Sequence, residues 1–250
     1  MSLLRSLLPL KWSALRYTLR ESWNDLFLHW ASGRQRFHQS LLDKAEEYAC
    51  TNLLREVAHL DGEIIECGVY RGHTLLRIAA VVGQVAQQKQ IYGMDSFGGF
   101  PVGSVKDVDV SDGRRINRVQ NKFQYAHRSV RRLERIGEMF DFNLRLVPGF
   151  FEDTLCELGD KRFCFVHLDC DIYESYKTCL NELYDRVVPG GLIVFDEYKH
   201  PVWPGASRAV DEFFDDRPES PEFFEGATQG NYFVRKQGNT FQAGHKEIAA

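Results

Sequence analysis

Long apolar runs are missing from this sequence of 250 residues. A membrane-spanning helix needs about 18 or more consecutive apolar residues, whereas the longest apolar runs here have the length of buried strands. The six cysteines form no C-x-x-C pair, which argues against a zinc ribbon or a disulfide scaffold and favours a reducing compartment. The dinucleotide fingerprint G-x-G-x-x-G is also absent, so a nicotinamide cofactor loses its main support. We therefore expect a cytoplasmic protein without a transmembrane span.

Charge is nearly balanced overall but uneven along the chain. Lysine and arginine number 31 against 35 aspartate and glutamate, a net charge of −4, and 44% hydrophobic residues suffice for a packed core. The first 38 residues carry six basic and two acidic side chains, with apolar residues at roughly helical spacing. This segment can lie on an anionic membrane surface or pack against a second subunit. We expect packing, and hence a homo-oligomer. Pro9, Lys11 and Arg16 interrupt any signal-peptide core, so we expect this segment to be retained.

The hydrophobic pattern divides the chain near residue 60. Residues 1–60 are predicted to form a helical extension for packing or oligomerisation, with one helix over 40–60, and residues 61–250 to form the main domain. Short apolar runs with little alternation follow, with amphipathic stretches at 75–85 and 176–187 between some of them. The runs lie at 63–67, 90–94, 163–168 and 191–195, with further strands expected at 144–147 and, antiparallel, at 232–235. Strands buried on both faces predict an α/β fold, a mostly parallel sheet with helices on either side.

Acids and glycines follow the predicted strands. In an open parallel sheet, ligands bind beyond the carboxyl ends of the strands, so these residues are candidates for a site. Gly68 and Gly72 follow the first strand and can let the backbone approach a ligand. Asp95, followed by Ser96, ends the second strand, where a carboxylate can accept hydrogen bonds from both hydroxyls of a ribose. Asp95 can instead cap a turn.

Four further carboxylates follow two other strands. Asp169 and Asp171 come after the strand at 163–168, and Asp196 and Glu197 after the strand at 191–195. If the first of these strands continues, Asp169 and Asp171 share one of its faces and can address one ligand. Clustered carboxylates repel one another unless a cation binds or water solvates them. A hard divalent cation such as magnesium suits such a set, and a solvated acidic rim is the alternative.

These segments together resemble the macrocin O-methyltransferase (TylF) family. The resemblance rests on D-x-D-x-Y-E from Asp169, a P-G-G strand ending in two acids and a tyrosine, and W-x-G-A-x-R-A-V-D-E-F at 203–213. It also includes E-C-G-V-Y-R-G at 66–72, D-S-F-G-G-F-P at 95–101 and P-G-F-F-E-D-T-L at 148–155, so that it covers roughly residues 40–213. The family implies a Rossmann-like class I methyltransferase fold and methyl transfer from S-adenosyl-L-methionine to a hydroxyl. It also implies a divalent cation such as Mg2+.

The resemblance also implies roles for individual residues. Asp169, Asp196 and Glu197 would hold the metal, and Asp171 would be the catalytic base. Glu197 departs from the family pattern, which more often has aspartate there. The cofactor side would be formed by Glu66 at the methionine amino group, Asp95 at the ribose and Asp153 near the adenine, together with Gly68, Gly72, Ser96 and Gly149. The implied acceptor is a small hydroxylated molecule such as a sugar or glycoside.

Other features leave alternatives open. Between residues 113 and 135, eight basic side chains stand against one acidic side chain, which suits either a phosphorylated acceptor or a solvated helix face. The acidic remainder of the chain argues against nucleic acid. His167 is expected to support the site from its strand, and Trp203 and Tyr198 either wall the acceptor or pack in the core. A non-catalytic module of the same fold that binds an anionic partner, and a nicotinamide-dependent oxidoreductase, are the rival functions.

Overall fold

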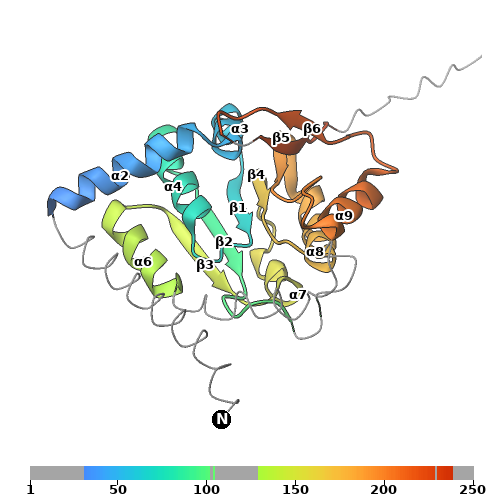
Figure 1. The fold of residues 1–250 in the computed structure, drawn as a ribbon, viewed down its shortest axis with the longest axis horizontal. Coiled ribbons are helices and arrows are strands. Elements are labelled where there is room, and N and C mark those ends of the chain that lie inside the picture. The colour runs from blue at the N-terminus through green and yellow to red at the C-terminus, as the bar shows by residue number, and fades with distance from the viewer. Residues whose placement is uncertain (1–30, 102–103, 105–128, 229, 239–250) are drawn as a thin grey trace, which may run out of the picture. The chain divides into compact units, whose positions relative to one another are not determined.

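A computed structural model of the protein describes residues 31–101, 104, 129–228 and 230–238 (Figure 1). Contacts divide the chain into two units, Met1–Asp43 and Lys44–Ala250, and the sheet belongs to the second. The helices are α2 (Ala31–Glu46), α3 (Ala49–Val57), α4 (His73–Val85), α6 (Ser129–Phe140), α7 (Phe151–Thr154), α8 (Tyr173–Leu183) and α9 (Pro204–Phe214). Two short 3-10 helices, η4 (Leu155–Leu158) and η5 (Tyr184–Arg186), follow α7 and α8.

Seven strands form one sheet in the order β3-β2-β1-β4-β5-β7-β6. They are β1 (Glu63–Cys67), β2 (Ile91–Asp95), β3 (Leu144–Pro148), β4 (Phe163–Leu168), β5 (Val187–Phe195), β6 (Glu222–Phe224) and β7 (Asn231–Arg235). The first five in sheet order run parallel, and β7 pairs antiparallel with β5 and with β6. The α/β prediction and the antiparallel late strand are therefore confirmed. The three-residue strand β6 was not predicted.

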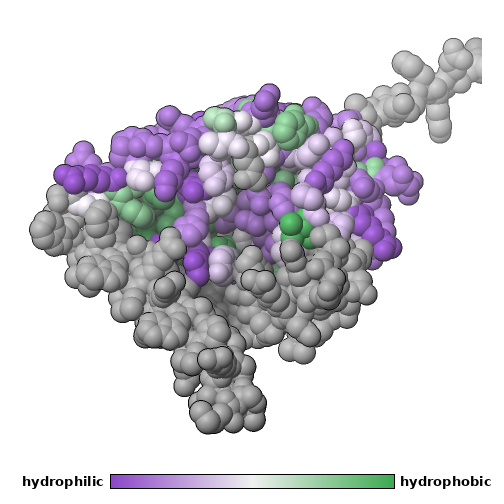
Figure 2. Space-filling model, in the orientation of Figure 1, coloured by the Kyte–Doolittle hydropathy of each residue, from purple (hydrophilic) through white to green (hydrophobic). Residues whose placement is uncertain are grey.

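Helices cover both faces of the sheet. On one face α3 packs against α4 and against β4 and β5. The apolar side chains of the other face form one cluster with α8 and α9, which also pack against each other. Every residue of β4 is buried, so this strand lacks the polar alternation of a half-exposed strand. In the view of Figure 2 the described surface is mostly hydrophilic, with small apolar patches.

The helix expected over 40–60 is instead two helices, α2 and α3, so that prediction was wrong in one respect. Tyr48 between them has an extended backbone, with φ −99° and ψ 128°. The Thr51 hydroxyl donates a hydrogen bond of 2.9 Å to the Tyr48 carbonyl, and the Thr228 hydroxyl donates one of 3.0 Å to the Glu47 carbonyl. These local and distant donors satisfy the carbonyl groups at the break, which an apolar stripe alone does not reveal.

Two other expectations concern residues that the structure mostly does not describe. Most of the basic N-terminal segment, and residues 113–128 of the basic segment, lie outside the described residues. The described part of the basic segment, residues 129–135, lies within α6 and includes Arg131, Arg132 and Arg135. Within the described ranges, no helix has the length and apolar character that crossing a membrane requires.

Candidate functional site

A pocket of about 330 Å³ lies where the parallel strands end. Its lining comes from the segments that follow β1, β2, β3, β4 and β5, the last of which ends at Trp203, directly before α9. The volume falls within the usual range for small-molecule sites. The expected site residues that line it are Gly68, Asp95, Ser96, Gly149, Asp169, Asp171, Asp196 and Glu197. Glu66, Gly72 and Asp153 do not belong to the lining residues.

The turn after β1 depends on glycine for its shape. Gly68 has a φ of +94°, and a Cβ there would lie 1.8 Å from the carbonyl oxygen of Asp169. The Asp169 amide in turn donates to the Cys67 carbonyl over 2.9 Å, so the first turn of the site and the acidic segment after β4 touch through their backbones. Gly72 caps α4 with a φ of +75°, and a Cβ there would overlap the Leu133 side chain. A side chain at Gly68 would force a backbone shift, whereas at Gly72 the left-handed backbone and the Leu133 side chain oppose one.

Asp95 holds the same turn from the end of β2. Its Oδ2 accepts hydrogen bonds from the amides of Val69 and Tyr70, each of 2.7 Å, and its Oδ1 accepts one of 2.6 Å from Phe97. A carboxylate has about four acceptor positions, so one remains for a ligand. The hydroxyl of Ser96 donates to the Gly99 carbonyl over 2.6 Å and shapes the following turn. Both expected residues therefore build the wall of the pocket that they line.

The segment after β3 closes the pocket beside Asp95. Gly149 donates a backbone hydrogen bond of 2.9 Å to the Asp95 carbonyl and has a φ of +151°. A Cβ at Gly149 would come within 2.4 Å of the Thr154 side chain. Phe151 and Glu152 of the short helix α7 line the pocket, whereas the expected Asp153 is exposed beside them. A one-residue difference in a short helix decides which carboxylate faces the pocket, and the sequence alone does not fix it.

Three carboxylates meet at the ends of β4 and β5. Asp169, Asp196 and Glu197 each offer one oxygen, and these oxygens all lie within 4.8 Å of one another. The Asp196 amide donates to the Leu168 carbonyl over 2.9 Å, which extends the parallel pairing and sets the acids side by side. Burial and then the Asp196 charge raise the pKa of Asp169 well above its usual range. Burial and then the Asp169 charge do the same to the pKa of Glu197.

This donor set fits a hard divalent cation. Carboxylate oxygens are the ligands that magnesium and calcium prefer, and a cation among them would remove the mutual repulsion that raises the two pKa values. Asn231, a buried residue of β7, donates a hydrogen bond of 3.4 Å from its side-chain Nδ2 to Oδ1 of Asp196. Nothing in the sequence around Asn231 pointed to the site, because β7 reaches it only through the antiparallel return of the chain.

Asp171 lines the pocket for a reason other than the expected one. The prediction that Asp169 and Asp171 share a strand face required β4 to continue, but β4 ends at Leu168. Asp171 has a φ of 62°, in the left-handed region, so alternation along a strand does not apply to it. Its amide lies 3.4 Å from Oε2 of Glu197. The tight turn, rather than the pleat, brings the two acids to one pocket.

Glu197 is held from behind by Tyr176. The buried Tyr176 hydroxyl, on α8, lies 2.6 Å from Oε2 of Glu197 and 2.9 Å from the Leu168 carbonyl oxygen. It also accepts a hydrogen bond of 3.2 Å from the Glu197 amide. Burial and then the Glu197 charge raise the pKa of Tyr176, so the phenol stays protonated and remains a donor. Tyr176 was not predicted as a site residue, because it lies outside the motifs that carry the predicted site.

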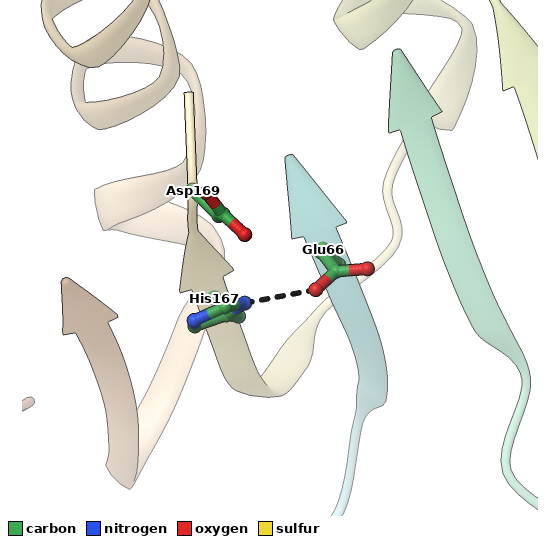
Figure 3. A group of neighbouring side chains, drawn as sticks. All are labelled: Glu66, His167 and Asp169. Atoms are coloured by element: carbon green, nitrogen blue, oxygen red, sulfur yellow. Dashed lines mark hydrogen bonds and ion pairs between the residues drawn. The ribbon is translucent and has the colours of Figure 1, made fainter. Parts of the chain in front are cut away.

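Glu66 and His167 form a buried pair close to Asp169 (Figure 3). They lie on the neighbouring strands β1 and β4, each side chain is 1% exposed, and His167 Nδ1 is 3.0 Å from Glu66 Oε1. Asp169 approaches the same pair from the end of β4 (Figure 3). Burial, which the His167 hydrogen bond only partly offsets, raises the pKa of Glu66. Glu66 thus makes its hydrogen bond with His167, on the neighbouring strand.

Aromatic and basic groups complete the lining. Trp203 lines the pocket, and its ring centroid lies 6.5 Å from that of Phe100 in an edge-to-face arrangement. Tyr198, for which walling the acceptor and core packing were both left open, belongs to the buried core cluster and donates a hydrogen bond of 2.7 Å to Asp211. Arg71 and His200 also line the pocket and were not predicted. Arg71 lies inside the E-C-G-V-Y-R-G motif, where no role was assigned to it, and His200 lies two residues after Tyr198, outside the quoted motifs.

Comparison with known proteins places these features in a family. Residues 29–233 match the sequence model described as Macrocin-O-methyltransferase (TylF). A relative from Streptomyces olivaceus, 8-demethyl-8-(2,3-dimethoxy-alpha-L-rhamnosyl)-tetracenomycin-C 4'-O-methyltransferase, is 32% identical over 141 residues, 55% of this chain and 53% of that protein. The demethyldecarbamoylnovobiocin O-methyltransferase of Streptomyces niveus is 29% identical over 158 residues, 62% of this chain and 59% of that protein. The matched region thus spans somewhat over half the length of these relatives.

Solved structures agree with the fold. The crystal structure of CalS11, a calicheamicin methyltransferase, superposes with a TM-score of 0.63 and 26% identity, covering 79% of this chain and 78% of that one. The structure of the O-methyltransferase NovP gives a TM-score of 0.62 and 25% identity, covering 75% and 78% of the two chains. The sheet is thus the Rossmann-like class I methyltransferase sheet that the sequence analysis predicted. With a family match over most of its length, the chain belongs to the macrocin O-methyltransferase (TylF) family.

Proposed function

We propose that this protein transfers a methyl group from S-adenosyl-L-methionine to a hydroxyl of a small, sugar-containing acceptor, with the help of a divalent cation such as Mg2+. One observation carries the proposal: the carboxylates after β4 and β5 share a single pocket with the glycine turn after β1 and with Asp95. Family membership and the names of relatives that methylate natural products support the reaction and the class of acceptor. A cytoplasmic location and a homo-oligomer stay predictions.

The cofactor side is assigned to the ends of β1, β2 and β3. The backbone of Gly68 gives the cofactor close access, and Asp95 keeps one acceptor position for the ribose while it holds the turn. Ser96 and Gly149 line the same part of the pocket. Glu152, which lines the pocket beside Asp153, is the better-placed acid for the adenine end. When bound, the cofactor supplies an electrophilic methyl group.

Two expected cofactor residues act from outside the lining. Gly72 gives α4 its start, because its left-handed backbone caps the helix that follows the turn. Glu66 is buried against His167, so we assign it to support of the turn after β1 rather than to first contact with the methionine amino group. Both roles preorganise the pocket.

The cation side is assigned to Asp169, Asp196 and Glu197, whose oxygens converge. When bound, a divalent cation lowers the pKa of a hydroxyl that it coordinates. Asp171 lines the pocket next to these acids, and we assign it as the base that takes the proton from the acceptor hydroxyl. Trp203 and Phe100 offer the apolar wall against which a sugar ring can pack.

An activity screen tests the proposal. The purified protein is incubated with methyl-labelled S-adenosylmethionine and Mg2+ against glycosides, nucleotide sugars, free sugars and catechols, with and without EDTA. Label transfer to a sugar-containing acceptor that stops in EDTA is the expected result. Transfer that continues in excess EDTA contradicts the cation assignment. If calorimetry detects binding of NAD but not of S-adenosylhomocysteine, the methyltransferase assignment is wrong.

A further inference from the structure

The side chain of Glu197 is one methylene longer than that of the neighbouring Asp196, and hydrogen bonds hold its carboxylate in place. Its side chain is buried, with 3% exposed, at the back of the acidic cluster. Two donors meet Oε2: the Tyr176 hydroxyl at 2.6 Å and the Asp171 amide at 3.4 Å. Neither of these donors occupies Oε1, and the Glu197 carboxyl group also interacts with the neighbouring carboxyl group of Asp169.

Tyr176 is itself fixed in place. Its side chain is completely buried on the first turn of α8, so the hydroxyl cannot swing to a different partner. The amide of Glu197 donates to this hydroxyl, and the Leu168 carbonyl oxygen lies within hydrogen-bonding distance of it. Leu168 is the last residue of β4, directly before Asp169. One phenol thus touches both strand ends that carry the acidic cluster.

The hydrogen bond from Tyr176 matters because the Glu197 side chain is long. A glutamate has one more rotatable bond than an aspartate, and a free glutamate loses more conformational entropy when it is held in one position. A carboxylate that accepts a hydrogen bond on one oxygen loses less freedom on binding a cation through the other oxygen. Hydrogen bonds from residues behind metal ligands have this orienting effect in metal sites generally.

We propose that Tyr176 is a positioning residue for the cation site: its hydroxyl holds Oε2 of Glu197 so that Oε1 faces Asp169 and Asp196. This inference rests on the proposed function, because it assumes that the three acids bind a divalent cation. It assigns Tyr176 no contact with the cation, the cofactor or the acceptor. Its effect therefore falls on the affinity for the cation and leaves the affinity for the cofactor unchanged.

Direct cation binding tests this role without any measurement of turnover. Mn2+ binding to the full-length protein is followed by electron paramagnetic resonance of the free ion, and S-adenosylhomocysteine binding by calorimetry. Tyr176→Phe removes only the hydroxyl and should weaken Mn2+ binding by about 10- to 100-fold, with cofactor-product affinity within about twofold of wild type. Tyr184→Phe is the matched control, because Tyr184 makes a similar 2.7 Å hydrogen bond to Glu219 but does not line the pocket. It should leave Mn2+ binding unchanged.

A double-mutant comparison separates positioning from general damage. Glu197→Asp shortens the side chain by about 1.5 Å, which takes its carboxylate out of reach of the Tyr176 hydroxyl. In the Asp background, Tyr176→Phe should therefore change Mn2+ affinity by less than about twofold. An equal loss in both backgrounds means that Tyr176 supports only the surrounding fold, and it overturns the inference.

The remaining outcomes are equally decisive. If wild type binds Mn2+ and Tyr176→Phe binds it as tightly, the inference is wrong and the cation site stands. If wild type binds no Mn2+, both the cation site and the inference fail. Should Tyr176→Phe fail to fold, a crystal structure of the wild type with Mn2+ decides the question. The expected result there is one Glu197 oxygen on Mn2+ and the other on the Tyr176 hydroxyl, and a Glu197 that leaves the hydroxyl overturns the role.

Discussion

Because Gly68 lies against the backbone of Asp169, we expect that a methyl group added at Gly68 will disturb both the cofactor side and the cation side of the site. In Gly68→Ala the new Cβ would sit 1.8 Å from the Asp169 carbonyl oxygen, against an ordinary contact of at least 3.4 Å, so the backbone must move by about 1.6 Å. Alanine in a left-handed conformation costs about 1–2 kcal/mol by itself. The forced shift adds to this cost, and a misplacement of about 1 Å can reduce turnover about 100-fold.

Gly159→Ala is the matched control for this variant. Gly159 also has a positive φ, of +52°, but nothing lies within 4 Å of the position that a Cβ would take there, so only the conformational cost applies. In urea titrations Gly159→Ala should lose about 1–3 kcal/mol of unfolding free energy, and Gly68→Ala more. Calorimetry should show that Gly68→Ala alone weakens binding of both S-adenosylhomocysteine and Mn2+. If the two variants are equally stable and bind both ligands like wild type, the proposed coupling of the two halves is refuted.

Three further predictions concern carboxylates of the site. Asp171→Asn should lower kcat by about 10²- to 10⁴-fold in steady-state kinetics while Mn2+ still binds, because asparagine tolerates the left-handed backbone; a loss below tenfold would assign the proton to another group. Asp95→Ala should weaken S-adenosylhomocysteine binding by about 1–3 kcal/mol in calorimetry, and unchanged binding would rule out its role. Because Asp169 and Glu197 have raised pKa values, the native state holds extra protons, so without cations stability should fall as the pH rises above about 4. Mg2+ should restore it increasingly with pH in thermal unfolding, and a cation effect independent of pH would contradict this.

The sheet could be predicted from the sequence because its strands are buried on both faces. The predicted strand at 163–168 matches β4 residue for residue, since a run that is apolar except for His167 and is bounded by Arg162 and Asp169 leaves little choice of limits. The break at Tyr48 could not be predicted, because one of the donors that satisfies it comes from Thr228, far along the chain. Local pattern cannot report a partner that only the tertiary structure provides.

The candidate site was predictable to a similar degree. The acids after β4 and β5 follow from strand order, because parallel strands bring their carboxyl ends to one edge. The position of Asp171 was reasoned from a strand that in fact ends at Leu168, so Asp171 reaches the pocket lining through a turn and not through the predicted strand face. Tyr176 and Asn231 reach the site through the packing of α8 and β7, which no local motif encodes.

The central claim is that cofactor and cation bind side by side in one pocket, and paramagnetic relaxation measures this directly. The methyl resonance of S-adenosylmethionine labelled with 13C in the methyl group is recorded in the presence of the protein with Mn2+ and, as the diamagnetic reference, with Mg2+. We expect strong Mn2+-dependent broadening in wild type and in Asp160→Asn, a control at an exposed site, and loss of the broadening in Asp196→Asn. A methyl line that is equally narrow with Mn2+ and Mg2+, although both ligands are bound, would contradict the claim.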